Sequence, residues 1–360
     1  MIEPAHAAVA PVFTIDGELV RDLARDCVRL EVCEGVEGLR TMQAWFMAVG
    51  REAPGPPDPL LHLDGRTIDL GRTVQVSLGP DGIQRRVFEG VVSAVELSFR
   101  DGQAVLVVLA EDQLMRLRMT RRMRSYTNTT DAGIARALAD EHGLDADAVA
   151  DGPTYDVVQQ LNQSDLAFLR ERARLVQAEL WCSGRTLHFR TRDQREGTTI
   201  TLVQGNHLLS ARLRADLAAQ RDTVVVTGYD ATRQRPIDRR AGPEAIEAEV
   251  TGGRNGPRLV ATALGTSTTF RVREVALNTD EAAAWARAEM LRRGRRFVTA
   301  EGTTRGSPDM VVGSRLRLEL VGAPFEGPGY YVTHVEHSFD AVNGFRTRFE
   351  AERPTLNEVA

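Results

Sequence analysis

The sequence predicts a β-rich α+β protein in which two similar antiparallel β-barrel domains flank an inserted α/β accessory lobe. Three observations lead to this fold class. Runs of alternating apolar and polar residues dominate both ends of the chain, and helical periodicity is confined to the middle. In addition, the last β-rich segment repeats the pattern of the first. The 360 residues are enough for two or three domains of roughly 100–200 residues each.

The first barrel is predicted from residues 11–112. The run "CVRLEV" alternates, "EGVEG" predicts a turn, and "LRTMQAWFMAVG" predicts a second strand. Four prolines between residues 51 and 59 indicate a loop. Further strands are predicted at "IDLGRTVQVSLG", "FEGVVSAVELSF" and "QAVLVVLAED".

The middle of the chain predicts helices. Residues 129–144 form the first, with Thr129 or Thr130 as its cap and Gly143 at its end. For the second, Asn162 followed by Asp165 resembles a capping box, or Ser164 is the cap. Its apolar residues recur at three- and four-residue spacing, and they are Leu166, Leu169, Ala173 and Val176. Its outer face carries Arg170, Glu171 and Arg174.

A hairpin and a third helix follow. The run "AELWCSGRTLHFRTR" predicts two strands that turn at Ser183 and Gly184. Residues 278–297 predict a helix that opens at Thr279 and ends at Gly294. The last sixty residues again have strand character.

The end of the chain repeats its beginning. Gly71 matches Gly313, and the alternating strand residues around them also match. The second half of the repeat matches after a gap of two residues: Val95, Glu96 and Phe99 correspond to Val335, Glu336 and Phe339. Side-chain parity is preserved, which a chance match between two antiparallel meanders would often break. The upstream strands of residues 27–50 resemble residues 208–229, so the second barrel is predicted to be interrupted.

These observations predict the domain limits. They are residues 1–118 for the first barrel, 119–205 for the first part of the accessory lobe, 206–239 for the first part of the second barrel, 240–299 for the second part of the lobe, 300–353 for the remainder of the second barrel, and 354–360 for a C-terminal tail.

Composition excludes several classes of function. The net charge is −5, so the whole chain is not an electrostatic binder of nucleic acid, and every one of the 45 basic residues is Arg. The chain has an odd number of cysteines without CxxC spacing, which argues against a disulfide framework and against a zinc site. They are Cys27, Cys33 and Cys182. No signal peptide is predicted, and the longest apolar run, 104–110, is too short for a membrane span. We therefore expect synthesis in the bacterial cytoplasm without stable membrane insertion.

Histidines and acids at the C-terminal end do not predict chemistry. His334 and His337 lie three apart on a predicted strand, so their side chains point to opposite faces and make a poor metal chelate. The matched Glu96 and Glu336 are expected to pair with an Arg on a neighbouring strand rather than to act as general acids.

Three further patterns are weighed in the same way. Cys182 and His188 could form a nucleophile–base pair, but no nucleophile elbow accompanies them, which favours a buried Cys and a strand His. The glycine-rich residues 251–258 lack GK[ST] and a strand-to-helix context, which favours a flexible turn over a phosphate loop. The basic run 115–124 is a solvated linker or a subunit interface, with a lipid or nucleic-acid contact as the alternative. No catalytic, cofactor or metal site is predicted.

One segment carries a family resemblance. Its pattern is Q-x-N-x-S-D-x-x-F-L-R-x-R-A, followed by a Trp, and its residues are Gln160, Asn162, Ser164, Asp165, Phe168, Leu169, Arg170, Arg172, Ala173 and Trp181. With "SYTNTTDAGIARALADEHGL" and "GRTLHF", this segment resembles the phage late-control D family of baseplate hub proteins. It is also similar to the hub half of type VI secretion spike proteins. The family often has Gly after this helix, where this chain has Gln177.

The resemblance implies a structural protein rather than an enzyme. Two barrels per chain in a homotrimer give a ring of six similar barrels, which matches a hexameric inner tube protein on one face and a trimeric spike on the other. Baseplate wedge proteins are further implied partners, and a spike encoded as a separate protein is expected. The particle is a phage tail, a tailocin or an extracellular injection system, and the sequence does not distinguish them.

Two other functions stay open at this point. One is a baseplate-associated component that binds or degrades the cell wall, which a peptidoglycan-release assay distinguishes. The other is a cytosolic enzyme, which predicts a ligand-dependent rise in melting temperature.

Overall fold

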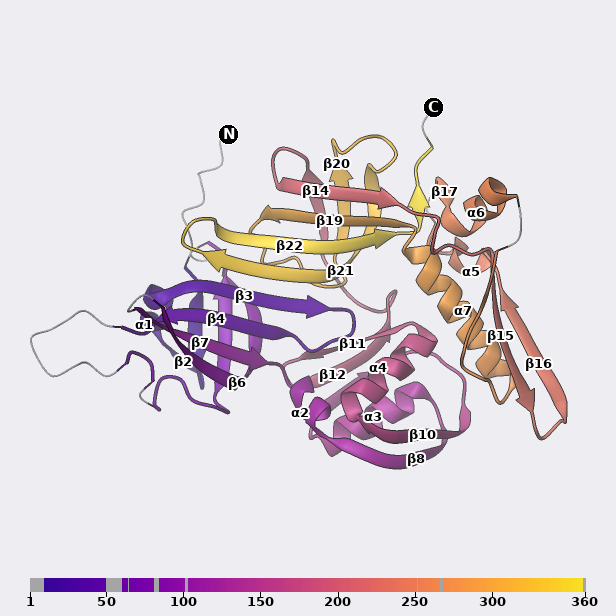
Figure 1. The fold of residues 1–360 in the computed structure, drawn as a ribbon, viewed down its shortest axis with the longest axis horizontal. Coiled ribbons are helices and arrows are strands. Elements are labelled where there is room, and N and C mark those ends of the chain that lie inside the picture. Colours follow the sequence, from indigo (N-terminus) through magenta and orange to yellow (C-terminus); the bar gives the residue numbers. More distant parts are fainter. Residues whose placement is uncertain are drawn as a thin grey trace, which may run out of the picture.

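The computed structural model describes residues 10–49, 60–63, 65–80, 84–100, 103–250, 252–265 and 268–358. The proline-rich loop predicted at 51–59 lies outside these residues. Two β-rich units stand one above the other, and the accessory lobe lies beneath and beside them (Figure 1). Each of the three parts has its own cluster of buried apolar side chains.

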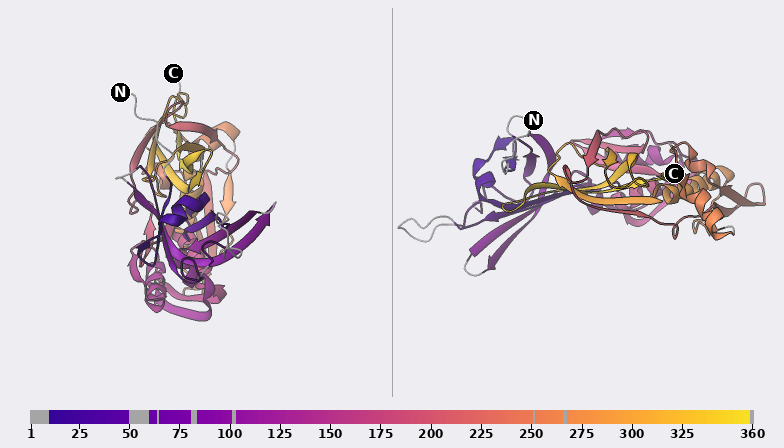
Figure 2. Two further views of the ribbon diagram at one scale, coloured as in Figure 1. Left: turned by 90° about the vertical axis from the view of Figure 1, so that its left-hand side faces the viewer. Right: turned by 90° about the horizontal axis from the view of Figure 1, so that it is seen from above.

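The first unit wraps an antiparallel sheet around a buried core. Its strands run in the order β3-β4-β7-β6-β5-β1-β2, and β6 and β7 form a long hairpin that projects from the body (Figure 2). Alternation places Val74, Val76 and Leu78 inside, as predicted. Its elements are β1 (Val12–Ile15), β2 (Glu18–Leu19), α1 (Arg21–Asp26), β3 (Cys27–Gly35), β4 (Thr41–Met47), β5 (Thr73–Leu78), β6 (Arg85–Arg100) and β7 (Gln103–Glu111).

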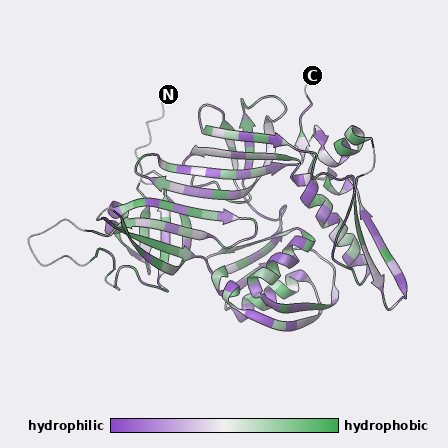
Figure 3. Cartoon of the chain, viewed as in Figure 1, coloured by the Kyte–Doolittle hydropathy of each residue, from purple (hydrophilic) through white to green (hydrophobic). Residues whose placement is uncertain are grey.

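The second unit has the same strand order. β14-β19-β22-β21-β20-β13 corresponds to β3-β4-β7-β6-β5-β1 of the first unit, except that β13 pairs parallel and β1 antiparallel. The internal repeat is therefore present in three dimensions. Hydrophilic and hydrophobic residues alternate along β21 and β22 (Figure 3). The elements are β13 (Thr199–Val203), β14 (Leu208–Ala215), β19 (Val298–Arg305), β20 (Arg315–Glu319), β21 (Gly327–Asp340) and β22 (Gly344–Arg353).

The accessory lobe is built from two separate stretches of the chain around one apolar core. Trp285 and Met290 of the later stretch pack in the same cluster as Phe168 and Leu169 of the earlier one. The elements are α2 (Leu114–Met119), β8 (Arg121–Thr129), α3 (Asp131–Glu141), β9 (Asp145–Ala148), β10 (Tyr155–Ser164), α4 (Asp165–Val176), β11 (Ala178–Ser183), β12 (Thr186–Thr191), β15 (Thr223–Asp230), β16 (Arg235–Ala241), α5 (Glu244–Glu247), β18 (Thr269–Arg271) and α7 (Thr279–Arg295).

Three sequence assignments need correction. Residues 222–229 were matched to the second upstream strand of the repeat, yet they lie in β15, in a separate sheet with β16 and β18. The counterpart of β4 is β19, which lies between β14 and β22. Strand β13, expected in the lobe, pairs with β20 of the second unit. In the expected tail, β23 (Thr355–Leu356) pairs with β17 (Arg254–Asn255), next to α6 (Gly256–Leu264). Alternation shows which face a strand buries but not which neighbour it pairs with.

The caps of the first two predicted helices are among those expected, and both ends of the third helix differ from the prediction. Thr130 caps α3 and Ser164 caps α4, because each side-chain oxygen accepts a hydrogen bond from a first-turn N–H. For α7 the cap is Asn278 rather than Thr279, and the helix continues past Gly294. In the described part of the chain, no helix combines the length and apolar composition needed to span a membrane.

Candidate assembly site

Asp165 is the centre of a buried polar cluster at the start of α4. Its side chain is fully buried and accepts hydrogen bonds from Arg122 Nε at 3.0 Å and Gln160 Nε2 at 2.8 Å. His142 Nε2 lies 2.8 Å from the second carboxylate oxygen, and the Tyr126 hydroxyl donates to Gln160 Oε1 at 3.1 Å. Gln160 and Asp165, two residues of the segment that carries the family resemblance and is called the signature below, therefore connect β8, β10, α3 and α4.

A second buried cluster surrounds Arg172. Its Nε lies 2.5 Å from Asp131 Oδ1, and its guanidinium stacks 4.3 Å from the centre of the Tyr155 ring. The Tyr155 hydroxyl donates to the other Asp131 oxygen at 2.8 Å, and burial raises the pKa of Asp131. Of the residues expected on the outer face of this helix, Glu171 and Arg174 are exposed and Arg170 is partly buried. Arg172, by contrast, is buried.

The other signature residues are structural in different ways. Asn162 takes a left-handed conformation at a bulge in β10, where its oxygens accept hydrogen bonds from Arg121, so it does not cap α4. Phe168, Leu169 and Ala173 are buried in the core of the lobe.

The end of α4 carries the predicted left-handed residue. Gln177 has φ of 55° and ψ of 34°, the position where the family often has Gly. We expect Gln177→Gly to be about 1 kcal/mol more stable than Gln177→Ala, because both lose the same side-chain hydrogen bonds and only Ala keeps the strained Cβ. Urea unfolding of the two variants measures this difference, and equal stabilities would contradict the assigned conformation.

Arg170 and Trp181 connect the lobe to the first unit. Arg170 donates to the carbonyl oxygens of Glu37 at 2.8 Å and Gly38 at 3.1 Å, in the turn between β3 and β4. A Cβ on Gly38 would lie 2.5 Å from the Leu180 carbonyl oxygen, so the close approach of turn and lobe requires glycine. Trp181 follows Leu180 on β11, and its ring lies 4.1 Å from the guanidinium of Arg195, which donates to Glu34 of the first unit.

A buried ionic network joins all three parts of the molecule, and sequence reasoning missed it. Arg195 donates to Glu34 of the first unit at 2.7 Å and to Glu179 of the lobe at 3.1 Å. Its guanidinium lies 4.1 Å from the centre of the Trp181 ring. The Tyr331 hydroxyl, from the second unit, donates to Glu179 at 2.5 Å. We call Glu34, Glu179, Arg195 and Tyr331 the joint network.

Neighbouring charges extend the joint network into the second unit. Arg192 stacks 3.9 Å from the centre of the Tyr331 ring and donates to Glu352 at 2.6 Å. Burial raises the pKa of Tyr331, which keeps its hydroxyl protonated as a donor. Alternation along the strand could have predicted a buried Glu34, since Glu34 lies on the same face of β3 as the buried Leu30 and Val32.

The repeat residues occupy equivalent positions in the two units. Gly71 has φ of 83° and its N–H donates to the carbonyl of Val92 at 2.9 Å. Gly313 has φ of 98° and donates to the carbonyl of Val332 at 3.0 Å. The long strand of each unit then bulges just after that acceptor residue. The alignment with its two-residue gap is thus reproduced by the hydrogen bonds.

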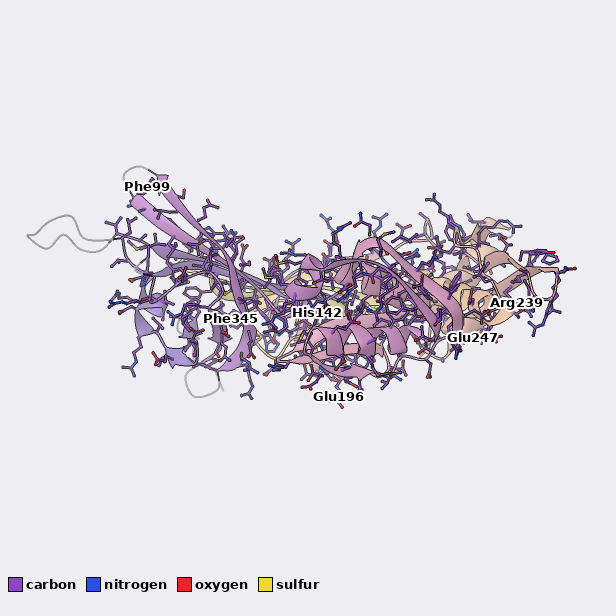
Figure 4. All side chains as sticks on the ribbon, turned by 90° about the horizontal axis from the view of Figure 1, so that it is seen from below. Phe99, His142, Glu196, Arg239, Glu247 and Phe345 are labelled. Carbon is purple, nitrogen blue, oxygen red and sulfur yellow. The ribbon has the colours of Figure 1, made fainter. Side chains whose placement is uncertain are left out.

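The two units are joined edge to edge by β3 and β21, which pair antiparallel. Within this seam Val335 is buried, and Phe339 is opposite Leu30 and packs into the core of the first unit. The equivalent Val95 is only half-buried, and Phe99 is 67% exposed compared with 7% for Phe339. Phe99 lies near the tip of the projecting hairpin (Figure 4).

The matched glutamates do not find the expected arginines within the chain. Glu336 is opposite Cys33 on β3 and Arg348 on β22, and Glu96 is opposite Val107 on β7. In the stretches that the structure covers, neither carboxylate forms an ion pair with Arg. The expected pairing is therefore wrong for the isolated chain.

The histidines lie on opposite strand faces, as predicted. His337 is buried with its Nδ1 3.1 Å from Thr347 Oγ1, while His334 is partly exposed. The structure does, however, bring His334 close to Cys33 and Glu336, whose ligand atoms all lie within 4.8 Å of one another. These donor types suit Zn²⁺, but burial raises the pKa of the Cys33 thiol to about 11, so a metal would have to displace its proton. The absence of a metal site stays a prediction.

His337 predicts acid sensitivity. Burial, together with the nearby Arg40, lowers its pKa to about 4 from 6.5. Between these values the unfolded chain binds a proton that the folded chain does not, so stability falls as the pH drops from 6.5 toward 4. His337→Leu introduces the residue found at the equivalent position, Leu97. Between pH 7 and pH 4.5 we expect the free energy of unfolding of this variant to fall by about 2 kcal/mol less than that of the wild type. Urea unfolding at both pH values measures this, and parallel losses would contradict it.

Cys182 and His188 do not form a nucleophile–base pair. Cys182 is buried opposite Leu187, and burial raises the pKa of its thiol to about 12. His188 stacks against Trp181 and its Nδ1 lies 2.7 Å from an Asp147 oxygen. Their adjacent register positions point to opposite faces of the hairpin.

The glycine-rich stretch corrects the sequence analysis. It leads from β17 into α6, so a strand-to-helix context does exist. The Asn255 side chain already accepts from the Arg258 N–H at the start of α6, and a Cβ on Gly256 would lie 2.4 Å from Gln220 Oε1. The glycine serves close packing, and the helix start is capped by the chain itself.

The basic run is also structured rather than a linker. It forms α2 and the start of β8, and three of its arginines form ion pairs within the chain. Arg118 pairs with Glu111 at 2.6 Å, and Arg122 and Arg124 both pair with Glu141. Two hollows in the described surface have volumes of about 30 and 230 Å³, below the roughly 300–1,000 Å³ typical of ligand sites. Neither is lined by Cys182 or His188.

Solved structures with this fold come from phage tails and secretion systems. The 43 kDa tail protein of prophage MuSo2 from Shewanella oneidensis is 15% identical, with a TM-score of 0.69 over 96% of this chain and 98% of that chain. A tail protein from Neisseria meningitidis is 12% identical, with a TM-score of 0.66 over 96% and 97%. A type VI secretion component from E. coli, described as similar to the T4 tail proteins gp27 and gp5, is 15% identical, with a TM-score of 0.53 over 93% and 76%.

These likenesses confirm at the level of the fold the resemblance to tail hub proteins that the sequence predicts. A comparison with curated proteins finds no match. The model of one protein family, described as the Alg8 N-terminal domain, matches residues 64–341, which is well over half of the chain. The match begins after β4 and ends after β21, so it covers the accessory lobe, strands β5 to β7 of the first unit and all strands of the second unit except β22. The chain therefore belongs to the Alg8 N-terminal domain family and has the fold of phage tail and type VI secretion proteins.

Proposed function

We propose that this protein is the structural baseplate hub of a contractile injection particle. In this role it forms a homotrimeric ring with pseudo-sixfold symmetry that joins a hexameric inner tube protein to a trimeric spike and contacts baseplate wedge proteins. The observation that carries the proposal is the repeat of one β unit within a single chain, with equivalent hydrogen bonds at Gly71 and Gly313. Three chains with two such units present six similar surfaces to a hexamer.

The joint network supports a mechanical role. Hub function requires that the two units and the lobe keep a fixed relative orientation under load. Arg195, Glu34, Glu179 and Tyr331 connect all three parts through buried charge-assisted hydrogen bonds. Such contacts hold the two units and the lobe in a fixed relative orientation, which is what this mechanical role requires.

Mass measurement of the purified full chain, alone and with its spike protein, tests the proposal. We expect trimers, and negative-stain images should show threefold rings with a central hole. A chain that stays monomeric in both conditions would overturn the proposed function. Release of soluble fragments from purified peptidoglycan would instead favour a cell-wall-degrading component.

A further inference from the structure

The seam between β3 and β21 has a counterpart that a single chain leaves unformed. In the strand correspondence between units, β3 matches β14 and β21 matches β6. Strand β14 is at the end of the sheet order, and β5 pairs with β6 only as far as Val91. Beyond that point, the second edge of β6 has no strand partner among the described residues, whereas the same edge of β21 pairs with β3.

Both unpaired edges are more exposed than their partnered equivalents. On β21, Phe339 is 7% exposed, whereas Phe99 of β6 is 67% exposed. On β3, Leu30 is fully buried, whereas the equivalent Ala211 of β14 is exposed. Long exposed edges with apolar side chains favour pairing with another chain. Strands β14 and β6 thus each resemble one strand of the β3–β21 seam that lacks its partner.

The register of the missing seam follows from the two pairings inside the chain. Cys33 pairs with Thr41 and Arg214 pairs with Thr299, and both β3 and β14 have a bulge at the same point. With Cys33 opposite Glu336 as the template, Arg214 falls opposite Glu96. The same transfer places Leu213 opposite Leu97. One pair of opposite charges and one apolar pair therefore meet at neighbouring positions, and such pairs stabilise cross-strand pairing, whereas the next position along places Arg212 opposite Ser98.

We propose that β14 of one copy pairs antiparallel with β6 of a second copy, with Arg214 opposite Glu96, Leu213 opposite Leu97 and Ala211 opposite Phe99. This seam rests on the proposed trimeric ring and specifies how its subunits join. It is head-to-tail, because each copy offers one β14 edge and one β6 edge, and it alternates around the ring with the seam inside each chain. The Arg partner that the sequence predicts for Glu96 then comes from the neighbouring copy.

Disulfide trapping in the purified full-length protein tests the register. Directly opposed Cβ atoms lie about 4.5–5.5 Å apart, within reach of a disulfide after small adjustments. We expect Glu96→Cys with Arg214→Cys to give a covalent trimer on mild oxidation. The matched control, Glu96→Cys with Ser210→Cys, is four residues out of register, about 13 Å away, and should not cross-link.

Charge reversal and an apolar-to-charged change test the contact energetically. We expect Arg214→Glu to weaken self-association about tenfold, since it places two acids opposite each other, and Arg214→Glu with Glu96→Arg to restore it. Phe99→Asp should weaken association by at least as much. Its control, Val275→Asp, changes a side chain of the same 67% exposure in the accessory lobe and should leave association unchanged.

The outcomes separate the two proposals. A trimer that cross-links in register and responds to the Phe99 and Arg214 variants supports both. A trimer whose control pair cross-links as well as the in-register pair, or that ignores these variants, overturns the β14–β6 seam and leaves the hub function standing. A chain that is monomeric at every concentration, with and without spike, and never cross-links overturns both.

Discussion

Replacing Arg195 by Met is expected to lower the free energy of unfolding by about 3–5 kcal/mol. The change removes the cation that the buried Glu34 and Glu179 share, and it leaves Glu34 paired with Arg40 and Glu179 paired with Arg192. Removing one partner of a buried ion pair costs about this much. The change also removes a contact that spans all three parts of the molecule. The midpoint of urea unfolding measures the effect.

Arg317→Met is the matched control for Arg195. Arg317 pairs with Glu319 at 3.0 Å, but both side chains are about half exposed, so the loss should stay below about 1 kcal/mol. Similar losses for the two variants would show that the joint network adds no more than a surface ion pair. Limited proteolysis gives a second readout, because a weakened joint should expose the connections between the units and the lobe.

Replacing Asp165 by Ala is expected to destabilise the accessory lobe by about 3–5 kcal/mol. Its carboxylate is fully buried and faces Arg122, His142 and Gln160. Its removal breaks all three contacts and leaves Arg122 paired with the more exposed Glu141 alone. Unfolding followed by the fluorescence of Trp285, which lies in the lobe core, measures the change.

Glu171→Ala on the same helix is the control for Asp165. Glu171 is exposed and accepts one surface hydrogen bond from Gln163, so its removal should change stability by less than about 0.5 kcal/mol. A small effect at Asp165 would mean that the signature marks something other than the stability of the lobe. A large effect at both positions would point to a general sensitivity of α4.

Much of the local structure could be predicted from the sequence because local rules decide it. Thr130 and Ser164 cap their helices through contacts three residues away, and Gln177 sits where the left-handed residue falls. Asn278 displaced Thr279 as the cap of α7 because its side chain accepts two N–H groups of the first turn. Such one-residue shifts are the usual extent of error for helix ends.

Pairing partners could not be predicted, because every backbone offers the same donors and acceptors. The run 222–229 has the strand character that the repeat would need, yet β19 takes the place beside β14. The cluster of Cys33, His334 and Glu336 likewise could not be predicted from the sequence, since about three hundred positions separate Cys33 from the other two residues. Strand β17 and helix α6 could not be predicted around Gly256, because glycine has a low propensity for both strands and helices.

The sequence by itself determined which face the predicted strands bury, where the three predicted helices begin to within a few residues and that one β unit occurs twice, since these depend on spacing within a few residues. The tertiary structure decided that β3 joins β21 and that Glu34 and Glu179 share Arg195. It also decided that, among the described residues, one edge of β14 and the second edge of β6 beyond Val91 have no strand partner. These features depend on contacts between segments far apart in the chain, whose geometry only the folded backbone fixes.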